Sequence, residues 1–145
     1  MNVVIDTNIV FSAILSPKGK IHDLVLNSDE EFNFFTPTFL IEELDIHHSK
    51  LKKISGFSDA DINFLKRTLF HHIAFIDPEI IREESWIKGF ELASEVDQKD
   101  TPFVALALDI EGQLWTGDKK LSNGLKAKKI DWTLTTNELF EKRKK

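Results

Sequence analysis

Short apolar runs alternate with helical stretches along the whole chain, and this alternation restricts the fold more than any other feature. The clearest run is Val3-Val4-Ile5, typical of a strand buried on both faces. Further strands are expected over 32–36, 73–76, 113–116 and 130–134. Helices between strands predict crossover connections and parallel pairing. We therefore expect an α/β fold, a three-layer α/β/α sandwich around a parallel sheet of four to five strands.

The helix signals have physical causes. Thr7 can cap a following helix with its hydroxyl, and the segment 58–61 resembles a capping box with Asp in place of Glu. Thr101 followed by Pro102 marks another start, because proline suits the first helical position. Helices are thus expected over 8–15, around 21–25, over 38–51, from 58 onward, from Trp86 through Phe90 and Ala93 to about 96, over 101–110 and from 135.

Length and composition bound the class of protein. The chain has 145 residues, and we expect 1–145 to form a single domain. It contains no cysteine, which excludes disulfides, thiolate zinc sites and cysteine nucleophiles. No apolar run approaches the roughly 18 residues of a membrane span, and no signal peptide opens the chain. We therefore expect a cytoplasmic protein without a membrane partner.

The net charge of −5 separates this chain from proteins that bind nucleic acid by electrostatics alone, which are usually basic. If the chain binds nucleic acid, metal ions and local basic patches must hold the phosphate backbone. Basic side chains gather in the C-terminal part, including Lys119, Lys120 and the run 142–145. Lys119 or Lys120 could contact phosphate, and either could equally be an ordinary exposed lysine.

Two acids follow predicted strands directly. Asp6 comes after the first strand, and Asp118 lies just past the fourth. In open parallel sheets, ligands bind beyond the carboxyl ends of the strands, so both side chains are expected at the same edge. Either acid taken singly could instead serve as a helix cap or a turn residue.

A third acid is selected by helix geometry. At ~100° per residue, Leu44 and Leu51 fall within ~40° of Leu40 and mark the buried stripe. Glu43 falls ~60° from Leu40, beside the stripe, whereas Glu42 falls ~200° away and faces solvent. A buried carboxylate is costly unless it is paired or binds a metal, so Glu43 is the glutamate expected in a site. It could also be a partly exposed residue at the margin of the stripe.

The fourth acid is Asp100, which directly precedes the helix start at Thr101. Its alternative role is favourable interaction with the helix dipole, and Asp97 is a competitor one turn earlier. Four carboxylates without cysteine favour a hard cation, Mg²⁺ or Mn²⁺, over zinc. The histidines show no metal-binding spacing, although His47 lies one turn beyond Glu43.

Four segments resemble, in order, the motifs of the PIN-domain family of ribonucleases, in particular its toxin-type, VapC-like members. The segment 4–10 resembles the opening strand with its Asp-Thr-Asn, 37–44 a second motif ending in an acid and Leu, 100–108 an acid leading into a small-residue helix, and 115–119 a strand ending in Thr-x-Asp. The resemblance places the second acid on Glu43 and spans nearly the whole chain.

This resemblance implies a PIN-like fold and an endonuclease that hydrolyses RNA phosphodiester bonds, leaving a 5′-phosphate and a 3′-hydroxyl. Bound Mg²⁺ or Mn²⁺ would lower the pKa of a water and orient it for in-line attack. Expected partners are an RNA substrate, the antitoxin of a toxin–antitoxin pair and, for a homodimer, a second copy of the chain. The catalytic and metal-binding residues would be Asp6, Glu43, Asp100 and Asp118, with Thr7, Asn8 and Thr116 hydrogen-bonded to the carboxylates.

Other functions stay open at this point. A binding module of the same fold, with weak or no catalysis, could recruit RNA or protein, although a pure binder has no reason to keep repelling acids together. A phosphatase with an Asp nucleophile would need Asp-x-Asp after the first strand, and here Asn8 stands two residues after Asp6. A phospho-receiver domain would need an acid pair at that place.

Overall fold

A parallel sheet of five strands forms the centre of the molecule in the computed structural model, which describes residues 1–144. The strands are β1 (Asn2–Ile5), β2 (Asn33–Pro37), β3 (Ile73–Ile76), β4 (Gln113–Trp115) and β5 (Thr133–Leu134), in the order β3-β2-β1-β4-β5. The predicted run Val3-Val4-Ile5 is fully buried at the centre of this sheet.

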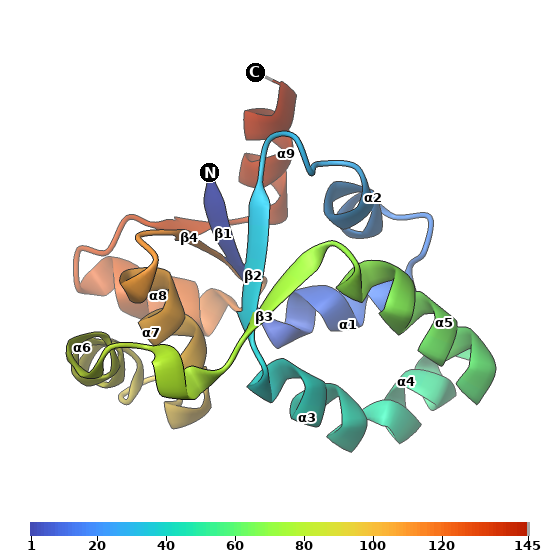
Figure 1. Ribbon diagram of the computed structural model, residues 1–145, viewed down its shortest axis with the longest axis horizontal. Coiled ribbons are helices and arrows are strands. Elements are labelled where there is room, and N and C mark those ends of the chain that lie inside the picture. Colours follow the sequence, from blue (N-terminus) through green and yellow to red (C-terminus); the bar gives the residue numbers. More distant parts are fainter. Residues whose placement is uncertain (145) are drawn as a thin grey trace.

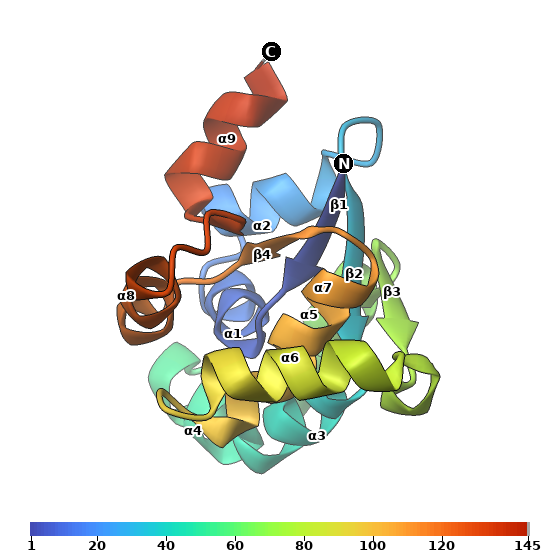
Figure 2. The ribbon, with the colours of Figure 1, turned by 90° about the vertical axis from the view of Figure 1, so that its left-hand side faces the viewer.

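Helices cover both faces of the sheet, which confirms the three-layer α/β/α architecture (Figure 1). One layer contains α1 (Thr7–Leu15), α2 (Lys20–Leu26), α3 (Phe39–Ile46), α4 (His48–Ser55) and α5 (Asp59–Phe70). The other contains α7 (Thr101–Asp109), which contacts β1, β2 and β4, with α6 (Glu83–Ala93) packed on it and α8 (Lys119–Ala127) against α6 (Figure 2). The last helix, α9 (Thr136–Lys144), packs against α2.

The chain leaves the neighbouring strands β1 and β4 into opposite layers. α1 follows β1 and packs among α2 to α5, whereas α8 follows β4 and packs against α6. Such a reversal between adjacent parallel strands opens a crevice outside their carboxyl ends, where ligands bind in open α/β sheets. The fold thus places its natural binding crevice beside Asp6 and Asp118.

The packing of α6 on α7 depends on a glycine. A Cβ on Gly89 would lie 2.9 Å from the backbone nitrogen of Ala105, so only glycine allows this close approach. The buried face of α6 therefore runs through Ser85, Gly89 and Leu92. Of the predicted stripe Trp86, Phe90 and Ala93, Ala93 is buried and Trp86 packs partly buried against the core, but Phe90 is wrongly placed, because it is 50% exposed.

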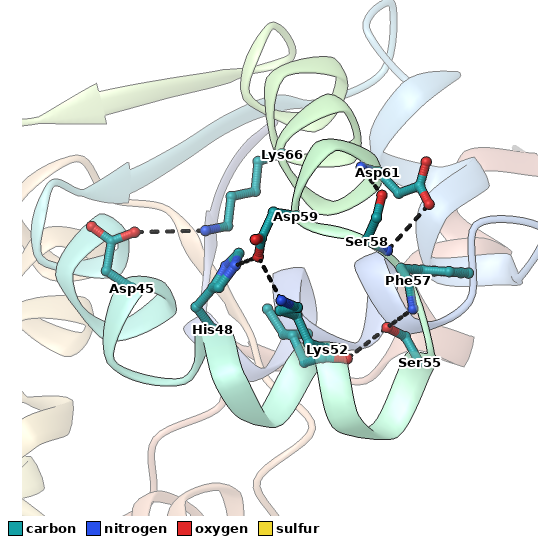
Figure 3. A network of polar contacts seen from close by, with 10 residues as sticks. Asp45, His48, Lys52, Ser55, Phe57, Ser58, Asp59, Asp61 and Lys66 are labelled. Atoms are coloured by element: carbon teal, nitrogen blue, oxygen red, sulfur yellow. Dashed lines mark hydrogen bonds and ion pairs between the residues drawn. The ribbon is translucent and has the colours of Figure 1, made fainter.

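The region expected as one helix over 38–51 is two helices. α3 ends at Ile46 and α4 begins at His48, with His47 at φ −96° and ψ 11° between them. Polar contacts then hold α4 against α5: Asp59 Oδ1 accepts from His48 Nε2 at 2.7 Å and lies 3.1 Å from Lys52 Nζ (Figure 3). Leu51 reaches the core fully buried after this change of direction.

Further bounds differ from the sequence predictions. The fifth strand is shorter than 130–134, the helix after Trp86 ends at Ala93 rather than near 96, and α8 was not expected at all. The capping boxes at Ser58 and Thr135 are both present, each with reciprocal hydrogen bonds.

Within residues 1–144, no helix has the length and apolar character needed to cross a bilayer.

Candidate carboxylate-lined active site

A cavity of about 280 Å³ lies at the carboxyl ends of β1 and β4. The four acids expected from the sequence all line this one cavity, although they come from four separate places in the chain. Its complete lining is Asp6, Thr7, Asn8, Phe11, Glu43, His47, Lys50, Asp100 and Asp118. The cavity occupies the crevice that the reversal between β1 and β4 creates.

Asp6 is the most buried of the four acids, with 6% of its surface exposed. Its Oδ1 accepts a 2.7 Å hydrogen bond from the Thr7 backbone N–H, and its Oδ2 accepts one of 2.7 Å from Thr116 Oγ1. The pKa of Asp6 is raised to about 6: burial is the largest cause, these two hydrogen bonds lower the pKa in part, and the negative charges of Glu43 and Asp118 add to the rise. Asp6, not Thr7, is the N-cap of α1, which corrects the cap expected from the sequence.

Asp118 caps the helix that follows β4. Its Oδ1 accepts hydrogen bonds from the backbone N–H groups of Lys120 and Leu121, at 3.0 and 3.2 Å. Its own N–H donates to Thr116 Oγ1 at 3.0 Å. The alternative role as a helix cap is therefore real, and it coexists with a place in the cavity wall.

Glu43 lies on α3, half-buried, with its Oε1 accepting a hydrogen bond from Thr7 Oγ1 at 2.5 Å. Glu42 is exposed, as the helix geometry predicted. The Thr7 hydroxyl thus connects α1 to α3, while the Thr7 backbone N–H donates to Asp6. A third contact is weaker: the Gly117 N–H lies 3.5 Å from Asn8 Oδ1 and links α1 to the turn after β4.

Asp100 enters the cavity from the start of α7. Its Oδ2 is buried and has no hydrogen-bond partner in residues 1–144. The pKa of Asp100 is raised to about 7, first by burial and then by the negative charges of neighbouring carboxylates, Asp6 foremost among them. The competing acid, Asp97, is exposed, lies outside the cavity lining and accepts a hydrogen bond from the Lys99 N–H.

The chemistry of the lining suits a hard cation. Four carboxylates share the cavity, two of them with raised pKa values, and a buried oxygen of Asp100 lacks a donor. A divalent ion would offset this repulsion and use that oxygen. As arranged in residues 1–144, however, no three acidic or histidine side chains converge on one point at metal-binding distance. The acids surround the cavity, and binding one ion by three of them would require side-chain rotation.

Sequence reasoning missed two residues of the cavity. Phe11 of α1 and Lys50 of α4 form its wall together with His47. His47 had been singled out by its place one turn after Glu43, but Lys50 had no signal, because the turn between α3 and α4 changes the direction in which it points. Phe11 would be recognised only as a partly buried aromatic on the exposed edge of α1.

The fold and the cavity together define a parallel α/β protein with a carboxylate-lined crevice at its topological switch point. The family model of the PIN domain matches residues 4–140, and the chain belongs to this family.

Among solved structures, the chain is similar to one in the "crystal structure of VapBC2 from Rickettsia felis bound to a DNA fragment from their promoter". The TM-score is 0.63 at 18% sequence identity, over 93% of this chain and 97% of the other, which shows a shared fold. No match to a curated protein sequence is found.

Proposed function

We propose that residues 1–145 act as one PIN domain, a metal-dependent ribonuclease that hydrolyses phosphodiester bonds of RNA in the cytoplasm. The observation that carries the proposal is the common cavity of Asp6, Glu43, Asp100 and Asp118 at the switch point of a PIN-family fold. Clustered acids destabilise a protein through mutual repulsion, so their presence in one cavity indicates a function. Cation binding and phosphodiester hydrolysis are functions that require such a cluster.

The four carboxylates would hold Mg²⁺ or Mn²⁺, whose oxygen preference they match. When bound, the ion supplies a Lewis acid that lowers the pKa of water and offsets charge on the phosphate. Thr116 and Thr7 orient Asp6 and Glu43 by hydrogen bonds, and the bond from Thr116 partly offsets the raised pKa of Asp6. Asp100, with a pKa of about 7, accepts or releases a proton near neutral pH.

The proposal extends to partners. The similar Rickettsia felis chain comes from a VapBC2 complex on promoter DNA, and we propose that this chain is likewise the toxin of a toxin–antitoxin pair. Ile46, Ile54 and Phe64 are exposed apolar side chains on α3, α4 and α5, and we propose that they contact an antitoxin or a second copy of the chain. Co-purification with the product of the neighbouring gene tests the pairing.

The deciding experiment measures cleavage of a labelled single-stranded RNA by purified protein with Mg²⁺, with Mn²⁺ and with excess chelator. We expect cleavage only with metal, and none by the Asp100→Asn variant in any condition. Cleavage at full rate in chelator would remove the metal mechanism. Hydrolysis of a small phosphomonoester without RNA cleavage would point to a phosphatase, and RNA binding without cleavage would point to a binding module.

A further inference from the structure

The lining of the carboxylate cavity includes an aromatic ring, an imidazole and a lysine besides the four acids. These side chains are Phe11 of α1, His47 between α3 and α4, and Lys50 of α4, and we call these three residues the α1–α4 shelf. A ligand in the cavity therefore meets an aromatic and cationic surface as well as the carboxylates.

The two rings of the shelf contact each other edge to face. The His47 ring stands at 87° to the Phe11 ring with a centroid distance of 6.4 Å, an edge-to-face arrangement. Phe11 is half-buried and packs against the core, while His47 is exposed. Packing against the core thus fixes the Phe11 ring. The edge-to-face contact with Phe11 in turn positions the solvent-facing His47 ring at the cavity.

Lys50 differs in charge environment from its basic neighbours His48, Lys52 and Lys66. Lys52 and His48 pair with Asp59, and Lys66 lies 3.6 Å from Asp45 (Figure 3). Lys50 forms no ion pair within residues 1–144 and instead stands over the Phe11 ring, 5.8 Å from its centroid. Among the lysines that the structure describes, it alone lines the cavity. Its charge is therefore available to an anion lying beside the carboxylates.

We propose that the α1–α4 shelf is a nucleotide-binding subsite for single-stranded RNA, in which Lys50 binds a phosphate and His47, supported by Phe11, stacks on an unpaired base. The proposal rests on the ribonuclease function proposed above and names the form of its substrate. A cation beside an exposed ring fits a phosphate and its attached base, the repeating unit of a single strand. Bases paired in a duplex are not free to reach such a ring.

The shelf also accounts for how an acidic chain holds RNA. The net charge of −5 gives no overall attraction for phosphate, and the four carboxylates repel it within the cavity. Metal would relieve the repulsion at the scissile phosphate alone. The next phosphate along the strand needs its own cation, and Lys50 stands at the wall of the same cavity.

The test is equilibrium binding by fluorescence anisotropy in Ca²⁺, with gel analysis to confirm that the probes stay intact. Two labelled probes are compared, a single-stranded uridine decamer and a ribose-phosphate decamer of the same length without bases. The variants are Lys50→Ala, His47→Ala and Phe11→Leu. The matched control is Lys53→Ala, which removes an exposed lysine from the same helix outside the cavity lining.

We expect Lys50→Ala to weaken both probes alike and to reduce the slope of log affinity against log salt by about 0.7, as loss of one single-strand phosphate contact requires. His47→Ala should weaken the uridine decamer about tenfold, as for one lost stacking contact, and leave the abasic decamer nearly unchanged. Phe11→Leu should reproduce part of the His47→Ala effect. Lys53→Ala should bind both probes as the unmodified protein does.

Equal binding and salt slope for the Lys50→Ala and Lys53→Ala proteins would overturn the phosphate contact. An unchanged preference for uridine over the abasic probe in His47→Ala would overturn the stacking contact. Because binding is read without cleavage, the two proposals fail separately. Protein that cuts RNA with Mn²⁺ but whose shelf variants bind normally refutes the shelf alone, and protein that binds as expected but never cuts refutes the ribonuclease alone.

Discussion

Thr116 Oγ1 donates a 2.7 Å hydrogen bond to Asp6 Oδ2 across 110 residues of sequence. The same oxygen accepts a 3.0 Å hydrogen bond from the backbone N–H of Asp118. One buried hydroxyl therefore joins the carboxylate that follows β1 to the turn that follows β4. This bridge spans the switch point, so the two strand ends of the proposed active site are held in a fixed relation.

Replacing Thr116 by Val removes this bridge with little change of volume. Donation to the ionised carboxylate favours its charged form, so its loss raises the pKa of Asp6 above its value of about 6. A hydrogen bond to a charged group contributes about 1.5–3 kcal/mol, which corresponds to a shift of one pH unit or more. The acidic limb of the pH profile of kcat/KM for RNA cleavage should move to higher pH by about that amount. Thr116→Ser, which keeps the hydroxyl, should leave the limb in place, and identical profiles for Val and Ser would contradict the bridge.

Glu43→Gln should be far more damaging to RNA cleavage than Glu42→Gln. Glu43 lines the cavity and accepts the hydrogen bond from Thr7, whereas its neighbour Glu42 is exposed and lies outside the lining. We expect a loss of at least about a hundredfold in kcat/KM for Glu43→Gln, of the order seen when a group acting in the transition state is removed. The measurement is cleavage kinetics on both variants after their melting temperatures are shown to be similar. Equal losses would show that Glu43 has no special role.

Asp6 makes the metal-free protein less stable as the pH rises. Its pKa of about 6 in the folded state lies above its ordinary value of 3.8, so the folded state resists ionisation. The resulting loss in the free energy of unfolding is absent below about pH 4 and grows as the pH rises towards 6. Above that pH the loss is complete, on the order of 3 kcal/mol. Asp6→Asn removes this penalty and loses one of two accepted hydrogen bonds, which costs about 0.5–1.5 kcal/mol. In chelator at pH 7.5, the variant should therefore melt at or above the temperature of the unmodified protein.

Millimolar Mn²⁺ should reverse that order. Binding to the native state raises the melting temperature by mass action, and it requires ionised carboxylates. The unmodified protein should gain more from Mn²⁺ than Asp6→Asn does, and more at pH 7.5 than at pH 5.5, where Asp6 and Asp100 are mostly protonated. Thermal melting at both pH values checks this. If Asp6 served as a cap alone, Asn would cap equally well and metal would change neither protein.

Gly89→Ala should destabilise the fold without touching the cavity. The added Cβ would lie 2.9 Å from the Ala105 backbone nitrogen and 3.0 Å from its Cα and Cβ, so α6 must move away from α7. Overpacking of this kind costs about 1–3 kcal/mol, measurable as a lower midpoint in urea unfolding. Lys88→Ala, an exposed neighbour on the same helix, is the control and should unfold at nearly the original midpoint. A Gly89→Ala protein as stable as this control would show that the helices separate without cost.

Much of the fold could be predicted because its signals are local. Val3-Val4-Ile5 is apolar on both faces and becomes the central strand. The capping box at Ser58 forms because its two hydrogen bonds involve residues only three apart. α8 was missed because its apolar signal is limited to two buried leucines, Leu121 and Leu125. Their spacing of four residues after an acid that can cap is the signal that could have found it.

Helix phase and helix breaks were predicted less well. On α6, the predicted face included Phe90, which is exposed, whereas the close approach of α7 brings the small residues Ser85 and Gly89 into the buried face. At His47, neither glycine nor proline marks the turn from α3 to α4. Both features are decided by how a neighbouring helix packs, and the sequence of one helix does not contain that information.

The sequence by itself determined that Asp6 and Asp118 lie together, because both directly follow parallel strands and the carboxyl ends of such strands share one edge. It also determined that Glu43 rather than Glu42 faces inward, since helical periodicity fixes relative direction. The resemblance to the family motifs pointed to Asp100, and the tertiary structure brings it to the same cavity because α7 crosses the opposite face of the sheet. Tertiary structure alone decided that Thr116 binds Asp6 in particular and that Lys50 lines the same cavity, since both depend on the packing of segments far apart in the chain.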